Sequence, residues 1–254
     1  EKQVSVNVGS NQGIWYDQAG ASYLDSDYFP LSSDFTSTAT EDGGHRENSY
    51  RKDSKLSFKV GVTPNATDEY AISYYKQDGE KGNPPSTDPA AARYWQWPLW
   101  DKESLYFISN TALGDQETLR VRLYTDKFNN GIDSYTDSTY SLLKKTGLGS
   151  VSTGKSRYDD KTNGGSVEIE SRRIKANTIK LVGHYKVDMH KETDANDQLN
   201  ADFKDTWRSI AVEDNIDLAQ NLMLSVGYAH HELIPDSVFK ASPTLSRLNC
   251  CISA

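Results

Sequence analysis

The stretch from Gly149 to Ser156 is the motif with the sharpest chemical meaning in this sequence. Its two glycines followed by Lys155 and Ser156 match the phosphate-binding loop, in which backbone N–H groups hold phosphate oxygens. That mechanism requires a helix that starts near the lysine. The residues 157–165 that follow are polar and end in two glycines, so we expect no stable helix there. We interpret the match as accidental, and a nucleotide-binding enzyme stays the weakest alternative.

The other polar clusters lack a catalytic or metal-binding pattern. His230 and His231 are not followed by the further histidine that a zinc protease helix would supply. Asp194, Asn196 and Asp197 resemble part of a calcium loop, but the glycine and the final glutamate are missing. No catalytic triad or carboxylate pair is present in the sequence pattern. We therefore expect no enzyme, no metal site and no cofactor.

An aromatic cluster is the most informative candidate for binding. Tyr94, Trp95, Trp97 and Trp100 lie within eight residues, which is too aromatic for an ordinary solvated loop. Such side chains combine an apolar body with a polar tip, and they gather where a strand crosses a membrane–water interface. They also form platforms on which ligands stack. We favour the interface girdle over a ligand-binding platform, and the two are compatible.

The composition limits what these residues can be part of. The chain has a hydrophobic share of 36% and a mean hydropathy of −0.71, and no apolar run approaches the roughly 18 residues of a membrane helix. The net charge of −8 argues against nucleic acid as a partner, because phosphate binding requires clustered positive charge. Cys250 and Cys251 are adjacent, so they neither staple a fold nor give a metal-ligand spacing.

The elements that must position the aromatic cluster are predicted to be β-strands. Apolar residues alternate with polar ones at a period of two, which is typical of strands with one apolar face. The clearest case is Leu56, Phe58, Val60 and Val62. The same alternation recurs at residues 4–8, 119–123, 167–169, 179–187, 210–212 and 222–228.

The connections between these strands favour a barrel over a sandwich. Short turns at 63–68, 114–117, 175–177 and 219–221 alternate with long polar stretches at 77–100, 129–160 and 191–206. Up-and-down membrane barrels place short turns at one rim and long loops at the other. The sequence therefore predicts an all-β, antiparallel up-and-down transmembrane β-barrel with roughly 10–12 strands, each near the 9–11 residues that cross a bilayer.

Several segments resemble the barrel of TonB-dependent outer-membrane receptors. They are Pro64–Tyr74, Gln77–Pro84, Tyr94–Lys102 and Tyr124–Asn130. The resemblance implies a barrel of about 22 strands with a plugged lumen. It also implies uptake of a siderophore complex or a similar scarce nutrient across the outer membrane of a Gram-negative bacterium. The implied partners are outer-membrane lipid, the small-molecule ligand, and TonB through an N-terminal region.

The resemblance covers residues 1–240, which we expect to be part of the receptor barrel. We find no plug and no TonB-contacting segment in the sequence, and the chain opens at Glu1 without a basic and apolar leader. Residues 241–254 do not continue the alternation, so we expect a non-barrel tail from a truncated or frame-shifted receptor. The alternative from another class is a secreted carbohydrate-binding β-sandwich that uses Trp95, Trp97 and Trp100.

Overall fold

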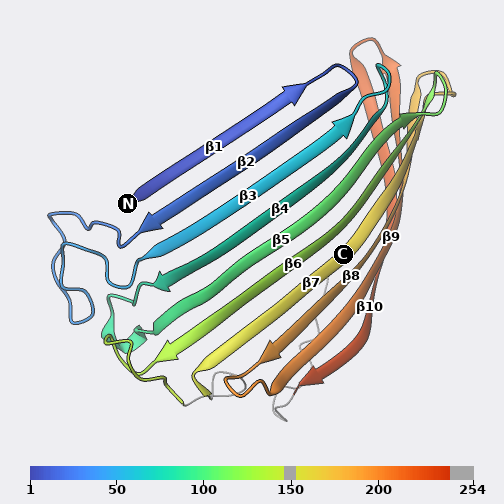
Figure 1. The fold of residues 1–254 in the computed structure, drawn as a ribbon. Coiled ribbons are helices and arrows are strands. Elements are labelled where there is room, and N and C mark those ends of the chain that lie inside the picture. Colours follow the sequence, from blue (N-terminus) through green and yellow to red (C-terminus); the bar gives the residue numbers. More distant parts are fainter. Residues whose placement is uncertain (146–152, 241–254) are drawn as a thin grey trace.

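The computed structural model describes residues 1–145 and 153–240, and these residues form one antiparallel sheet of ten strands (Figure 1). Each strand pairs with the next in the chain, from β1 to β10, which confirms the predicted up-and-down order. Among the described residues β1 and β10 are the edges of the sheet. The strands are β1 (Lys2–Asn11), β2 (Trp15–Ser26), β3 (Arg51–Val62), β4 (Glu69–Asn83), β5 (Tyr94–Ala112), β6 (Glu117–Tyr135), β7 (Lys155–Ser171), β8 (Asn177–Thr193), β9 (Leu199–Ala219) and β10 (Leu222–Lys240).

One face of this sheet is apolar and uncovered. Ile169, Leu181 and Val212 are cross-strand partners on β7, β8 and β9, and their exposed fractions are 43%, 45% and 43%. The same holds for the alternating residues of β3, where Leu56 and Phe58 are exposed by 50% and 47%. Among the described residues the fully buried hydrophobic ones are Ala71 and Ala201. The sheet therefore encloses no apolar core, and its apolar face requires an apolar surrounding outside the chain.

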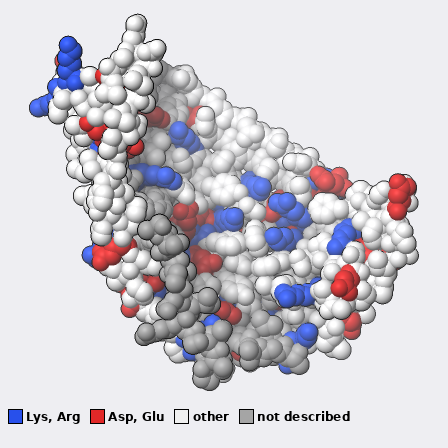
Figure 2. Space-filling view, turned by 180° about the vertical axis from the view of Figure 1, so that it is seen from behind, with Lys and Arg blue, Asp and Glu red and all other residues white. Residues whose placement is uncertain are grey.

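The opposite face is polar and hollowed. Figure 2 shows Lys, Arg, Asp and Glu side chains spread across this concave face. Arg120 on β6 bridges two carboxylates of β7, at 2.5 Å from Glu168 and 2.9 Å from Glu170. Tyr106 on β5 donates a hydrogen bond of 2.7 Å to Asp126 on β6. The period-two pattern thus separates an apolar convex face from a charged concave one.

The connections are sorted by length between the two rims. Residues 12–14, 63–68, 113–116, 172–176 and 220–221 join strands at one rim. The connections 27–50, 84–93 and 194–198 lie at the other rim, together with 136–145 and 153–154, the described parts of the connection between β6 and β7. The long connections predicted at 77–100 and 129–160 are shorter in the structure, because β4 ends at Asn83 and β5 begins at Tyr94, while β6 ends at Tyr135 and β7 begins at Lys155. The long connection predicted at 191–206 was wrong, because β8 continues to Thr193 and β9 begins at Leu199. Charged residues that read as a loop instead continue as strands past the apolar belt, where both faces are polar.

Two further expectations are decided by these elements. A β-sandwich needs two packed sheets, and the described residues form a single sheet, so the carbohydrate-binding sandwich is wrong as a fold. Lys155 begins strand β7 rather than a helix and lies 3.9 Å from Asp133, as expected for an accidental phosphate-loop match. Residues 149–152 of that motif and the predicted tail 241–254 lie outside the described residues.

Helical structure in the described part is limited. The three-residue 3-10 turn η1 (Pro89–Ala91) is capped by Asp88, whose side chain accepts a hydrogen bond from Ala90 N. Within residues 1–145 and 153–240, no helix is long and apolar enough to cross a membrane.

Candidate functional site

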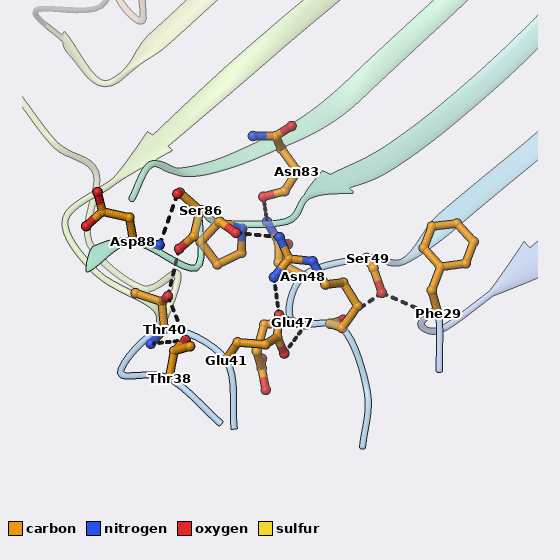
Figure 3. Close-up of polar contacts among 12 residues, drawn as sticks. Phe29, Thr38, Thr40, Glu41, Glu47, Asn48, Ser49, Asn83, Ser86 and Asp88 are labelled. Carbon is orange, nitrogen blue, oxygen red and sulfur yellow. Dashed lines mark hydrogen bonds and ion pairs between the residues drawn. The ribbon is translucent and has the colours of Figure 1, made fainter. Parts of the chain in front are cut away.

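The candidate site lies at the rim with the long connections, where β4 and β5 meet the connection 27–50 (Figure 3). Asn48 fastens this connection to both strands through its side-chain amide. Its Nδ2 donates to the carbonyl oxygens of Asn83 at 2.9 Å and of Trp95 at 2.7 Å. A Cβ at Gly82 would lie 2.1 Å from the carbonyl oxygen of Asn48, so this close approach requires glycine.

A buried carboxylate holds the connection 27–50 against the connection 84–93. Glu41 has a side chain that is 0% exposed, and it forms an ion pair with Arg46. Its carboxylate oxygen Oε1 also accepts a hydrogen bond of 3.0 Å from the backbone N–H of Glu47. Arg46 in turn donates to the carbonyl oxygen of Pro85 at 2.6 Å. These bonds join the connection 27–50 to the connection 84–93, and Figure 3 shows this part of the rim with its polar contacts.

An irregularity at Pro98 determines where the tryptophans point. Trp97 and Trp100 are three residues apart, and a regular strand would place them on opposite faces. The register of β5 shifts against β4 between the pairs Gln77–Lys102 and Lys81–Trp97, and against β6 between Gln96 and Leu99. Such a bulge admits a proline, which cannot donate a ladder hydrogen bond. The two rings therefore meet edge to face, with centroids 5.1 Å apart.

A lysine lies over these rings. The Nζ of Lys81 is 3.4 Å from the ring centroid of Trp100 and 5.5 Å from that of Trp97. Trp100 also packs edge to face on Phe128, with centroids 4.9 Å apart. Burial, and then the charge of nearby Arg51, lowers the pKa of Lys81 below its usual value. We call Lys81, Trp97, Trp100, Phe128 and Arg51 the rim cluster.

A recess opens beside the rim cluster. It has a volume of about 250 Å³ and is lined by Arg51, Lys81 and Trp100 from the strands and by Phe29 from the connection 27–50. Asp53 at its base is buried and accepts a hydrogen bond of 2.8 Å from Gln77 Nε2. Arg51 is ion-paired with Asp53, and Glu80 also lines the recess. The ammonium group of Lys81 beside the indole ring can bind an anionic group together with a flat apolar surface.

The four predicted binding residues do not form one group. The register places Trp95, Trp97 and Trp100 on the polar concave face, whereas Tyr94 pairs with Tyr135 on the other face. Trp95 donates from Nε1 to Ser134 Oγ at 3.1 Å. The interpretation of these tryptophans as a lipid-facing girdle is therefore wrong, because the bulge and the register turn them inward. Their role as a ligand platform stays a prediction.

Tyrosines form a second aromatic group at the same rim. Tyr140 packs edge to face on Tyr94 and on Tyr135, with centroid distances of 6.1 Å and 5.5 Å. Burial is the main cause that raises the pKa of Tyr140 to about 12, and it raises the pKa of Tyr50 to about 12 as well. These hydroxyls stay neutral at physiological pH, so the tyrosines carry no charge to a ligand.

Metal-binding geometry is limited in the described part of the chain. Carboxylate oxygens of Glu41, Asp42 and Glu47 lie within 4.8 Å of one another, but Glu41 is already paired with Arg46. The acidic segment near Asp194 is a turn, in which its Oδ1 accepts from the backbone N–H groups of Asn196 and Gln198.

Sequence reasoning missed Lys81, Arg51 and Phe128. Lys81 stands between two glycines, in a segment that reads as a loop, although it lies on β4 and pairs with Trp97. Arg51 and Phe128 come from β3 and β6, far from the tryptophans in the chain. The cross-strand register brings these residues together, and no local sequence pattern predicts that they are neighbours.

The fold is similar to that of a solved structure. The copper transporter OprC aligns with this chain at a TM-score of 0.65 and 13% sequence identity. The match covers 92% of this chain and 39% of that protein, so the chain spans well under half of its length. At this identity the likeness concerns the fold alone. No protein-family model matches the sequence, and no curated protein matches it either.

Proposed function

We propose that this chain is part of the barrel of a TonB-dependent outer-membrane receptor, which takes up a siderophore complex or a similar scarce nutrient. In this proposal the apolar convex face meets outer-membrane lipid, and the concave face lines the ligand's route through a plugged barrel of about 22 strands. In this proposal TonB is a separate partner protein that contacts the receptor through an N-terminal region. The fold similarity to a transporter supports the proposal.

The distribution of side chains between the two faces is the observation that carries the proposal. Apolar residues cover the convex face, whereas the hollow face holds ion pairs and charged side chains (Figure 2). A soluble protein would bury the apolar face and expose the polar one. In this chain the apolar side chains are exposed on the convex face and the charged ones line the concave face. A barrel that is embedded in lipid and has a polar lumen requires this arrangement.

The rim cluster supports an anionic organic ligand. Lys81 supplies positive charge, and Trp97 and Trp100 supply apolar surface at the rim with the long connections. The charge of Arg51 is balanced by its ion pair with Asp53. We therefore propose a chelate or another acidic small molecule as the ligand.

The proposal is tested by fractionation of cells that produce the protein, followed by electrophoresis of heated and unheated samples. We expect the protein in the outer-membrane fraction, where a folded barrel migrates differently from the heat-unfolded form. Recovery of folded protein in a soluble extract without detergent would contradict the proposal. Uptake of a ferric siderophore by producing cells, compared with cells that lack the protein, tests the transport step separately.

A further inference from the structure

The convex face of β7, β8 and β9 contains a groove that the proposed transport function does not use. Its volume is about 960 Å³, and apolar surface makes up most of its lining. Val167, Tyr185 and Ile210 form walls, and all three are exposed, by 46%, 49% and 54%. The groove is thus a slot in the face that the proposed function places in lipid.

Glycine creates the slot. Gly183 on β8 lies between Val167 on β7 and Ile210 on β9 in the register. A Cβ at Gly183 would meet no atom within 4 Å, so the space above it is open. The register partners Val167 and Ile210 carry large apolar side chains, and Gly165, which pairs with Tyr185, is a second glycine in the lining. The missing side chain therefore leaves room for a narrow apolar chain along the strand.

Two cations stand at the end of the groove nearer the long connections. Arg208 and Lys204 line it and are exposed on the same face of β9 as Ile210. Asp202, two residues from Lys204 on the same face, lies 3.9 Å from Lys191 Nζ. Two further carboxylates come from β10. Glu232 is the register partner of Arg208, and Asp236 Oδ2 lies 3.9 Å from Lys204 Nζ. Asp236 already accepts a hydrogen bond of 2.5 Å from Thr206 Oγ1, so it is a shared and distant partner for Lys204.

We propose that this groove binds one acyl chain of a membrane lipid whose phosphate head group contacts Arg208 and Lys204. The inference rests on the proposed placement of the chain in a membrane. An apolar slot that ends at two cations is complementary to an anionic lipid, whose chain and phosphate are arranged in the same order. Arginine suits this role because its guanidinium binds phosphate oxygens in pairs.

The test compares two lipids that differ in head group alone. The protein is purified in a mild detergent, stripped of lipid, and titrated with dimyristoyl phosphatidic acid or dimyristoyl phosphatidylcholine, with retained lipid measured by native mass spectrometry. We expect the wild-type protein to retain the acidic lipid about tenfold more tightly, as one charge-assisted contact provides. Equal retention of the two lipids would overturn the inference.

Variants separate the two parts of the site. Gly183→Phe fills the slot and should reduce retention of both lipids, whereas Ala21→Phe on the same face of β2 should change nothing. The double substitution Arg208→Gln with Lys204→Gln should abolish the preference for phosphatidic acid, so that its retention falls to that of the zwitterionic phosphatidylcholine. Lys76→Gln, which removes an exposed lysine of β4, should keep the preference.

The outcomes also distinguish this inference from the proposed function. Lipid retention that Gly183→Phe leaves unchanged would overturn the groove as the site, even if the protein needs detergent. Dimers that Gly183→Phe dissociates would overturn it in favour of a second copy of the chain. A protein that stays folded without detergent would overturn the membrane placement itself, before any lipid is added.

Discussion

The ammonium group of Lys81 lies 3.4 Å from the ring centroid of Trp100, although the two residues come from different strands. Both side chains line the recess of about 250 Å³ at the rim. Because the cation is held against the ring, the positive charge has a fixed position beside an apolar surface. This pair is the part of the rim cluster from which the first two predictions follow.

Replacement of Trp100 by Ala should weaken ligand uptake. The substitution removes the apolar wall of the recess and frees Lys81, so we expect the KM for uptake to rise about tenfold. Trp207→Ala is the matched control, because Lys186 lies 5.1 Å from that ring on the same face but away from the recess. The measurement is concentration-dependent uptake of a labelled ferric siderophore. An equal effect of both substitutions would contradict a specific role for Trp100.

The lowered pKa of Lys81 predicts a pH dependence of ligand binding. Its cause is burial first and the charge of Arg51 second. As pH rises through this lowered pKa, the ammonium group loses its proton and an anionic ligand loses a partner, so affinity should fall at a lower pH than for an ordinary lysine. The same shift affects folding stability. In the pH range between the lowered pKa of Lys81 in the folded protein and its ordinary pKa in the unfolded chain, the unfolded chain binds more protons. The free energy of unfolding therefore rises with pH in this range.

Lys81→Arg supplies the control for that pH dependence. Arginine keeps its charge throughout the range, so the alkaline loss of affinity attributable to this position should disappear. Binding is followed by tryptophan fluorescence across the pH series. A profile that is identical in the two proteins would assign the pH dependence to another group.

Gly82→Ala should detach the connection 27–50 from β4. The added Cβ would lie 2.1 Å from the carbonyl oxygen of Asn48, so the backbone must move and the bonds from Asn48 to Asn83 and Trp95 must lengthen. We expect a local loss of about 1–3 kcal/mol, seen as faster proteolysis within residues 27–50. Gly183→Ala has open space and should leave proteolysis unchanged.

Phe58→Arg should impair insertion of the protein into the membrane. Phe58 is 47% exposed in the middle of the apolar pattern of β3, and a cation at the bilayer midplane costs about 2–4 kcal/mol in a barrel. Ser57→Arg adds the same charge to the concave face and should be tolerated. The heat-dependent shift in electrophoretic mobility reports the folded fraction. Greater harm from Ser57→Arg would reverse the assignment of the two faces.

The strands and their faces could be predicted from the sequence because they depend on a local repeat. The alternation at Leu56–Val62 and Leu119–Leu123 fixes which side chains share a face, since successive residues of any strand point in opposite directions. The short connections follow from turn-forming residues such as those at 63–68. Strand ends were less predictable, because a strand that leaves the apolar belt loses the contrast between its faces, as β8 and β9 do.

The rim cluster was decided by the tertiary structure. The sequence shows that Tyr94, Trp95, Trp97 and Trp100 are close in the chain, and a regular period of two would have put Trp97 and Trp100 on opposite faces. The bulge at Pro98 brings both rings to the concave face. Whether a strand bulges depends on its register with two neighbours, and the position of Lys81 depends on the same register. Such pairings join residues far apart in the chain, so they cannot be predicted from local periodicity.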